Sequence, residues 1–169
     1  MTDPLAPKPM RASQVTLVQL MEQTDANLAG IVHGGVVMRL ADTAAGLAAI
    51  KHSGGLAVTA SMDQMAFYHP VHLGDTLTVK ASVNDVGRTS LEVGVRVESE
   101  NIFTRETLHT STAYFVYVAI DRDGKPRPVP PIVAESDEDR RRQEEAQVRR
   151  QSRLAHRAAI EELRRGSGA

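Results

Sequence analysis

The chain has 169 residues, of which 41% are hydrophobic and 24% are charged, and its formal net charge is -1. This length supports one domain with a full core plus an appendage, and no apolar run is long enough to span a membrane. The near-neutral charge and the absence of tryptophan argue against a nucleic-acid-binding surface, and the absence of cysteine excludes disulfides, thiolate metal sites and a cysteine nucleophile. The N-terminus lacks the apolar segment of a secretory signal, so we expect a soluble cytoplasmic protein.

The first part of the chain predicts one strand, one loop and one helix. Residues 1–10 contain three prolines and are predicted to be disordered, ahead of a domain placed at residues 11–125. Gln14–Met21 is short, apolar and compatible with a strand, and Asp25–Gly35 has the small, turn-forming residues of a loop. Val36–Lys51 carries apolar residues on almost every face, which predicts a helix buried on all sides.

Four strand-like segments follow this helix: Leu56–Tyr68, Thr76–Val83, Thr89–Glu98 and Thr107–Ile120. A helix that is apolar all round must be wrapped, and the only available material is this antiparallel sheet. We therefore predict an α+β fold in which a curved antiparallel sheet surrounds one long buried helix. One such sheet leaves a face and two edges uncovered, so a dimer or a larger assembly is expected.

The C-terminal part is different in composition. Residues 126–134 form a proline-rich linker that should be stiff and extended. The tail, residues 135–169, contains the strongly charged segment Glu135–Arg165, which predicts a helix that Ser136 is suited to cap. Its apolar residues are too sparse for a long coiled-coil seam. We expect a solvated helix that docks loosely on the body or on a neighbouring subunit.

The tripeptide His33-Gly34-Gly35 stands where the loop becomes the buried helix. The first N–H groups of a helix have no internal partner and lie at its positive end, so they can bind an anion or a carbonyl oxygen that becomes negative during attack. The alternative is a tight turn that merely needs glycine. His33 could hydrogen-bond a substrate or simply position the turn.

Asp42 is the only acid between Gly30 and Lys51, and its neighbours on the helix are apolar or small. A carboxylate in such surroundings is unfavourable unless it has partners or a task, and it would suit a general base or a nucleophile. The alternatives are a salt bridge to Arg39 or a polar contact at a subunit interface. Asp42 lies about 12 Å along a helix from Gly34. A site that combines the two therefore needs Gly34 from one subunit and Asp42 from another.

Two further places carry candidate binding residues. The Asn27 amide could orient a water molecule or a substrate carbonyl, with an Asx turn as the alternative. Arg88 stands beside the hydroxyls of Thr89 and Ser90 and could clamp a phosphate, with a solvated hairpin turn as the alternative. The remaining histidines show no metal-ligand spacing, so no metal site is predicted.

Four segments, in order along the chain, resemble the hotdog-fold acyl-CoA thioesterases. They are N-L-A-G-I-V-H-G-G-V-V-M-R-L-A-D-T-A from Asn27, V-T-A-S-M-D-Q-M-A-F-Y-H-P from Val58, V-G-R-T-S-L-E-V-G-V from Val86 and H-T-S-T-A-Y-F-V-Y-V-A-I-D from His109. They are most similar to the cytosolic acyl-CoA hydrolases that include the brain acyl-CoA hydrolase and the bacterial YciA type. The resemblance implies the hotdog fold, hydrolysis of acyl-CoA to free acid and CoA, and homo-oligomers in which dimers assemble into trimers of dimers.

The resemblance also implies catalytic roles. The acid at the position of Asp42 acts as general base or nucleophile, and the asparagine at the position of Asn27 assists from the partner subunit. The backbone at the positions of Gly34 and Gly35 polarises the thioester carbonyl. The best-studied animal members carry two hotdog domains in tandem, whereas this chain has one copy, so a homodimer should hold two equivalent sites.

The binding residues implied by the resemblance lie elsewhere in the chain. The family's V-G-R-T-S turn lies near bound CoA, which brings in Arg88, Thr89 and Ser90. His33 replaces an aromatic residue of the YciA type and is assigned to the substrate-binding set. No cofactor is implied, because CoA is part of the substrate and the product, and neither a nucleic acid nor a membrane is an expected partner.

Two other functions stay open at this stage. A hotdog hydratase or dehydratase needs a histidine paired with an acid in a different motif, which His33-Gly34-Gly35 lacks. A non-catalytic acyl-CoA sensor would more often lack an acid in the buried helix and carry a DNA-binding segment. CoA binding without turnover would favour the sensor.

Overall fold

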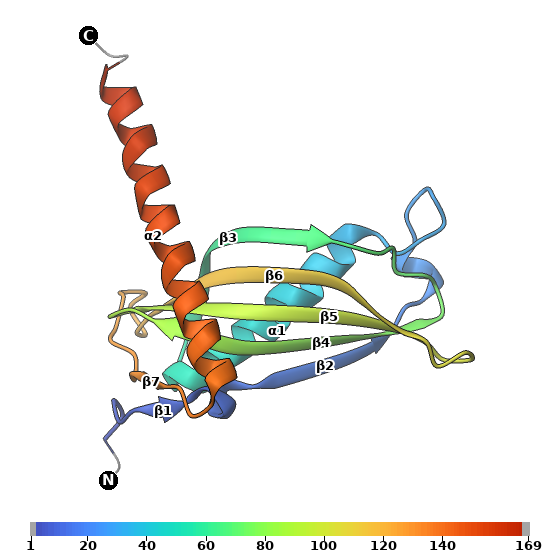
Figure 1. The fold of residues 1–169 in the computed structure, drawn as a ribbon, viewed down its shortest axis with the longest axis horizontal. Coiled ribbons are helices and arrows are strands. Elements are labelled where there is room, and N and C mark those ends of the chain that lie inside the picture. Colours follow the sequence, from blue (N-terminus) through green and yellow to red (C-terminus); the bar gives the residue numbers. More distant parts are fainter. Residues whose placement is uncertain (1–2, 167–169) are drawn as a thin grey trace.

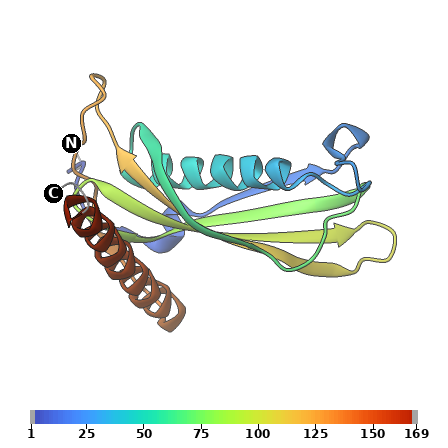
Figure 2. The same cartoon turned by 90° about the horizontal axis from the view of Figure 1, so that it is seen from above.

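The structure is a computed structural model that describes residues 3–166. Five strands form one antiparallel sheet in the order β2-β4-β5-β6-β3 (Figure 1). Their bounds are Val15–Leu20 (β2), Ala57–Phe67 (β3), Asp75–Val86 (β4), Ser90–Asn101 (β5) and Thr107–Ala119 (β6). Helix α1, Gly34–Ser53, lies on one face of the sheet, and helix α2, Asp137–Gly166, crosses the other face (Figure 2). The predicted α+β fold, with a curved sheet around one long helix, is confirmed.

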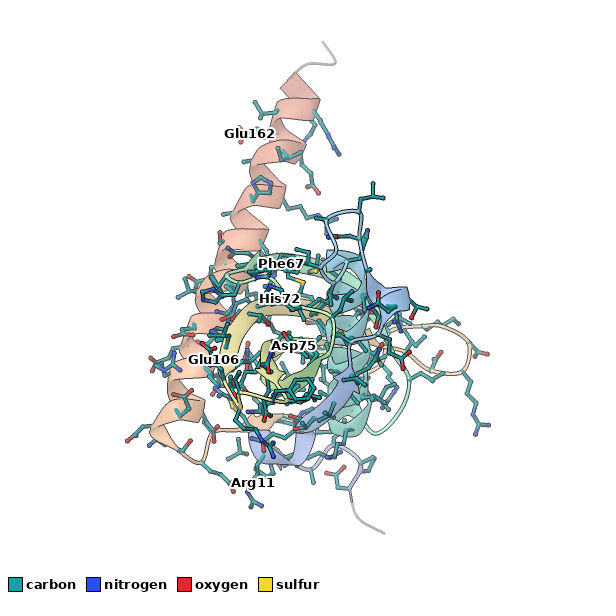
Figure 3. All side chains as sticks on the ribbon, turned by 90° about the vertical axis from the view of Figure 1, so that its right-hand side faces the viewer. Arg11, Phe67, His72, Asp75, Glu106 and Glu162 are labelled. Carbon is teal, nitrogen blue, oxygen red and sulfur yellow. The ribbon has the colours of Figure 1, made fainter. Side chains whose placement is uncertain are left out.

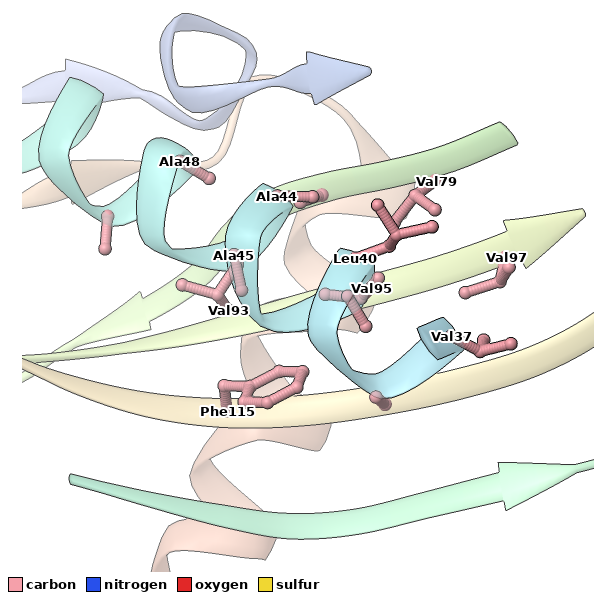
Figure 4. Close-up of a cluster of buried hydrophobic side chains, with 14 of the residues drawn as sticks. Val37, Leu40, Ala44, Ala45, Ala48, Val79, Val93, Val95, Val97 and Phe115 are labelled. Atoms are coloured by element: carbon pink, nitrogen blue, oxygen red, sulfur yellow. The ribbon is translucent and has the colours of Figure 1, made fainter. Parts of the chain in front are cut away.

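The core lies between α1 and the sheet (Figure 4). Strands β4 and β5 alternate, so every second side chain points toward the helix. The helix meets them mostly with alanines, whose small side chains let the strands approach its backbone. Fully burying a valine, leucine or phenylalanine side chain contributes about 1.5 to 3 kcal/mol. The buried set includes Val37, Leu40, Ala44, Ala45, Ala48, Val79, Val93, Val95, Val97 and Phe115.

One face of α1 remains uncovered, so the prediction of a helix buried on all sides was wrong for the single chain. Met38, Leu47 and Ile50 are exposed on this face, which we term the open face, and Asp42 lies among them. The five strands curve around the alanine side of the helix only. Strand β3 borders the same region as an edge strand with exposed apolar side chains. The apolar residues of the open face therefore need a partner outside this chain.

The two ends of the domain are tied together, which the sequence did not predict. Lys8–Pro9 (β1) pairs in parallel with Ile132–Val133 (β7), and Met10, the first residue of the short 3-10 helix η1 (Met10–Ser13), is buried. The expected disorder of residues 1–10 was therefore wrong for residues 8–10, because an apolar anchor and a backbone pairing hold them. Residues 1–2 lie outside the described part. The linker also packs against the domain, and its residues Val129 and Pro130 are buried.

His52 fixes the linker to the last turn of α1. It is fully buried, and its Nε2 donates a hydrogen bond to the carbonyl of Pro130 at 2.9 Å. Its Nδ1 is buried without a partner among residues 3–166. Burial lowers the pKa of His52, the Pro130 carbonyl acts in the opposite direction, and the positive charge of Lys8 lowers the pKa further. His52 is therefore held in its neutral form.

We expect acid to destabilise the protein through His52. The folded histidine has a pKa below its ordinary value of 6.5, so the unfolded state binds more protons as the pH falls below that value. The contribution of neutral His52 to the free energy of unfolding is fully present above pH 6.5. Below pH 6.5 the free energy of unfolding falls by up to about 1.4 kcal/mol per pH unit. In His52→Gln, which keeps a donor for Pro130, urea midpoints should vary less with pH. His69→Gln, at an exposed histidine, is the control, and an unchanged pH dependence in His52→Gln would contradict the prediction.

Helix α2 begins as predicted and docks more firmly than predicted. The Asp139 N–H donates to Ser136 Oγ at 3.1 Å, and the Ser136 N–H donates to the Asp139 carboxylate at 3.3 Å. Arg149 and Arg153 both reach Glu92 on β5, whose side chain is only 4% exposed. The C-terminal half of α2 projects away from the body (Figure 1). In the described part of the chain, no helix is long and apolar enough to cross a membrane.

Candidate active site

Asp42 lies at the border of the open face of α1, on the side of strand β3, where it is half-buried. Its Oδ1 accepts hydrogen bonds from Thr59 Oγ1 at 2.8 Å and from the Tyr117 hydroxyl at 2.7 Å. Thr59 and Tyr117 face each other as partners in the pairing of β3 with β6. Among residues 3–166, Oδ2 of Asp42 has no partner and Arg39 makes no ion pair with it. One carboxylate oxygen is thus fixed, and the other is open to a water molecule or a reacting carbon.

Sequence reasoning missed both partners of Asp42. A signal existed for Tyr117, since it occupies an inward position of β6, and a buried tyrosine hydroxyl needs a hydrogen-bond partner. Burial raises the pKa of Tyr117 well above its ordinary range; the contact with Thr59 acts in the opposite direction, and the contact with Asp42 raises the pKa further. The hydroxyl therefore stays protonated and acts as a donor. Thr59 carried no comparable signal, because threonine is common on any strand.

The N-terminus of α1 is capped by His33, whose Nδ1 accepts from the Gly35 N–H at 2.9 Å. The Val36 N–H is also engaged, by the His33 carbonyl at 2.8 Å. The two N–H groups predicted to bind a carbonyl oxygen are thus reduced to one, that of Gly34, which has no partner in the described part of the chain. The ring of Phe67 packs beside Gly34, at the end of the molecule that faces the viewer in Figure 3. His33 here positions the turn, and its Nε2 has no partner among residues 3–166.

Asn27 lies in the loop that leads to this helix end. Its side-chain Oδ1 accepts from the N–H groups of Ala29 at 2.8 Å and Ile31 at 3.4 Å, so the Asx turn considered from the sequence is present. The loop follows the 3-10 helix η2, Gln23–Asp25, and the His33 N–H donates to the Asp25 carbonyl at 2.8 Å. These bonds hold Asn27 near the start of α1. Its Nδ2 has no partner among the described residues and remains a free donor.

The predicted phosphate clamp is the turn between β4 and β5. The Gly87 N–H donates to the Ser90 carbonyl at 2.8 Å, and Arg88 is exposed at the tip, followed by Thr89. Helix α2 adds a second guanidinium, because Arg150 lies 3.0 Å from the point where a Cβ at Gly87 would stand. Sequence reasoning missed Arg150, which looked like one more charge on a solvated helix.

The structure separates the predicted residues into two groups. Asp42 and the turn form one group, because Ser90 pairs with the residue that follows Tyr117 on β6. The other group lies at the N-terminus of α1, beside Phe67, and contains Asn27, His33, Gly34 and Gly35. Gly34 and Asp42 are eight positions apart, which corresponds to about 12 Å of helix. One chain therefore does not bring the two groups together.

A groove lies apart from both groups. A cavity of about 390 Å³ separates α2 from the outer face of the sheet and is lined by Ser82, Gly94, Tyr114 and Arg141, among others. It opens on the face of the sheet opposite α1, and none of the predicted site residues lines it. In the described part of the chain, no three acidic, histidine or cysteine side chains gather as metal ligands would.

Comparisons with known proteins agree on one family. The family model described as "Thioesterase superfamily" matches residues 29–102. The chain is 34% identical over 129 residues to the uncharacterized acyl-CoA thioester hydrolase YkhA of Bacillus subtilis, covering 76% of this chain and 75% of that protein. It is 33% identical over 145 residues to the mouse cytosolic acyl coenzyme A thioester hydrolase, covering 85% of this chain but 38% of that protein.

Solved structures give the same result. An apo hexameric acyl-CoA thioesterase superimposes with a TM-score of 0.88 at 36% identity, covering 90% of this chain and 98% of that one. The Staphylococcus aureus acyl-CoA hydrolase, solved with butyryl-CoA and CoA, has a TM-score of 0.86 at 30% identity, covering 96% and 99%. Further structures of that hydrolase carry alanine in place of an asparagine, an aspartate and a threonine. The chain belongs to the thioesterase superfamily. Within it, the chain is a member of the acyl-CoA thioester hydrolases, and hence an enzyme.

Proposed function

We propose that this protein hydrolyses acyl-CoA thioesters to free acid and CoA at sites shared between two copies of the chain. The observation that carries the proposal is the position of Asp42. Its unengaged Oδ2 opens on the uncovered face of α1, whereas the free N–H of Gly34 lies about 12 Å along the same helix. Groups that act on one thioester carbon must lie within a few ångströms of it. The second group must therefore come from another copy.

A second copy related by a two-fold axis meets this need. Two α1 helices that run antiparallel with their open faces together place Gly34 of the partner subunit near Asp42. The same contact covers Met38, Leu47 and Ile50, and it lets the edge strands β3 of the two copies lie side by side. Assembly of three such dimers into a hexamer is part of the proposal, supported by the hexameric thioesterase that this chain resembles.

The chemistry follows from the two half-sites. The N–H of Gly34 of the partner subunit, at the positive end of its helix, donates to the thioester oxygen as that oxygen becomes negative. The Nδ2 of the partner's Asn27 aligns the carbonyl or the water. Asp42 either removes a proton from the attacking water or attacks the carbonyl carbon itself, forming a mixed anhydride that water then hydrolyses. In both routes the bond to sulfur breaks and CoA leaves as the thiol.

Two further observations support these assignments. In the Staphylococcus aureus hydrolase, the substituted asparagine, aspartate and threonine are spaced along the chain as Asn27, Asp42 and Thr59 are spaced here. The turn that carries Arg88 lies at the end of the sheet where Ser90 pairs beside Tyr117, and Arg150 of α2 adds a second cation there. Guanidinium groups suit the phosphates of CoA. Binding through CoA would leave the acyl chain free to vary. A cytoplasmic location is part of the proposal, supported by the mouse relative, which is named a cytosolic hydrolase.

A mixing experiment tests the shared site. Asn27→Ala and Asp42→Asn proteins should each lose most of their activity as homodimers. Unfolded together and refolded in equal amounts, they should regain about a quarter of the wild-type activity, because half of the random dimers hold one site with both residues intact. Each protein refolded alone is the control. If mixing restores nothing although mixed dimers form, Asn27 and Asp42 act within one chain and the shared site is refuted.

A further inference from the structure

Asp42 is held by more than one contact to the same tyrosine. We propose that Tyr117 is a positioning residue that fixes the carboxylate of Asp42 so that Oδ2 is the oxygen that reacts. The inference rests on the proposed function, in which Asp42 performs the chemistry, and it adds a residue that does not touch the substrate. Tyr117 acts through Asp42 alone.

The geometry around the hydroxyl is unusually restrictive. The Tyr117 oxygen lies 2.7 Å from Oδ1 of Asp42 and 2.8 Å from the backbone carbonyl oxygen of the same residue. It therefore links the side chain of Asp42 to its own turn of helix. The tyrosine itself is 2% exposed and its ring lies 6.4 Å, between centroids, from the ring of Phe115. A residue so packed cannot follow the carboxylate if the carboxylate rotates.

Gly46 makes room for this contact. It lies one turn after Asp42 on α1, and a Cβ added there would stand 3.4 Å from the Tyr117 hydroxyl oxygen. The absence of a side chain lets the hydroxyl lie flat against the helix, within reach of the carbonyl and the carboxylate together. Any polar side chain at this position would compete for the tyrosine proton.

Two donors occupy Oδ1, and this decides which oxygen is free. A carboxylate oxygen has two lone pairs in its plane, and here the hydroxyls of Thr59 and Tyr117 take both. Burial keeps Tyr117 protonated, so it can only donate to the ionised carboxylate. Strands β4 and β5 turn apolar side chains toward α1. On α1 itself, Arg39 lies about one turn before Asp42 without pairing to it. The hydroxyls of Thr59 and Tyr117 are thus the polar groups of the described chain that contact the carboxylate of Asp42.

Removing the hydroxyl should have two consequences. The carboxylate loses one of the bonds that hold its plane, and misplacement of a reacting group by about 1 Å can lower a rate about 100-fold. The ionised form also loses a donor, so more of the enzyme is protonated and inactive at acidic pH. Substrate binding is untouched, because Tyr117 lies behind Asp42. If Tyr117 only supported the fold, the loss of its hydroxyl would lower the activity by the same factor at every pH.

The test is Tyr117→Phe, assayed by thiol release from acyl-CoA as a function of pH. We expect kcat to fall about 10- to 100-fold, KM to stay within about twofold, and the acidic limb of the kcat profile to move to higher pH. Tyr114→Phe is the matched control, because Tyr114 lies on the same strand but on the outer face, beneath Arg149. Its kcat and pH profile should match those of the wild type.

The outcomes separate a failure of this inference from a failure of the proposed function. A Tyr117→Phe protein with wild-type kcat and pH profile overturns the inference, and so does a loss that is uniform across pH. If Tyr117→Phe fails to fold, Gly46→Ser is the second test. The serine hydroxyl competes for the Tyr117 proton, so kcat should fall and the acidic limb of the kcat profile should move to higher pH. An unchanged profile of Gly46→Ser overturns the inference. Full activity of Asp42→Asn would refute the proposed function itself, whereas an inactive Asp42→Asn beside a normal Tyr117→Phe refutes only the role of Tyr117.

Discussion

Replacing Asp42 by asparagine is expected to slow acyl-CoA hydrolysis about a thousandfold while leaving the protein folded and assembled. Asparagine has the same shape and keeps an oxygen that can accept from Thr59 and Tyr117. Its other atom is an amide nitrogen, which neither removes a proton from water nor attacks a carbonyl carbon. The loss should therefore fall on kcat. Thiol release from acyl-CoAs of increasing chain length, from acetyl to palmitoyl, measures it and ranks the substrates at once.

The control for this prediction is Asp123→Asn, at an exposed turn on the surface, which should leave the rate unchanged. An Asp42→Asn protein that hydrolyses at the wild-type rate would remove Asp42 from the mechanism. A wild-type protein that binds acyl-CoA but releases no thiol from any chain length would favour the sensor considered from the sequence. Asp42 would then have only a structural role.

The sheet could be predicted because its pattern is local. Residues of β4 and β5 alternate between apolar and polar, and that period alone defines a strand with one buried face. The start of α1 was predicted two residues late, at Val36 in place of Gly34. Glycine has a poor helix propensity, so Gly34 and Gly35 look like loop, and it is the His33 side chain, bonded to the Gly35 N–H, that draws them into the helix.

The apolar pattern of α1 was read correctly but assigned to the wrong partner. Met38, Leu47 and Ile50 are as hydrophobic as the residues that face the sheet, yet the sheet does not cover them. A sequence records burial without recording whether the covering surface belongs to the same chain or to another. The helix looks buried all round because one face meets β4 and β5 and the other, in the proposed dimer, meets a second copy.

The candidate catalytic aspartate could be found from the sequence, and its partners could not. Asp42 stands out as a lone acid in an apolar segment, which is a local feature. Thr59 and Tyr117 lie 17 and 75 residues away and meet it only through the register of β3 with β6. A shift of edge strand β3 by one residue would turn Thr59 to the other face of the sheet, whereas β5 would still hold Tyr117 in place. Three-dimensional structure was needed to assign them.

The same limit applies to the attachment of α2, which sequence alone presents as a solvated arginine-rich helix. Arg149 donates to Oε1 of Glu92 at 2.7 and 3.0 Å and stacks 3.7 Å above the ring of Tyr114. Arg153 donates to Oε2 of Glu92 at 2.9 Å and also pairs with Asp63 on β3. Both oxygens of a nearly inaccessible carboxylate are thus neutralised by one helix. Arg153 also ties the edge strand β3 to β5.

Substituting both arginines, Arg149→Met together with Arg153→Met, is expected to lower the free energy of unfolding by about 3 to 5 kcal/mol, because Glu92 is left buried without a cation. Urea unfolding measures the loss. Adding Glu92→Met should restore most of it, since apolar side chains of similar volume replace the whole buried network. Arg140→Met and Arg157→Met break exposed pairs on the same helix and should change stability by less than about 0.5 kcal/mol. A double variant as stable as these controls would mean that α2 does not bury Glu92 in solution.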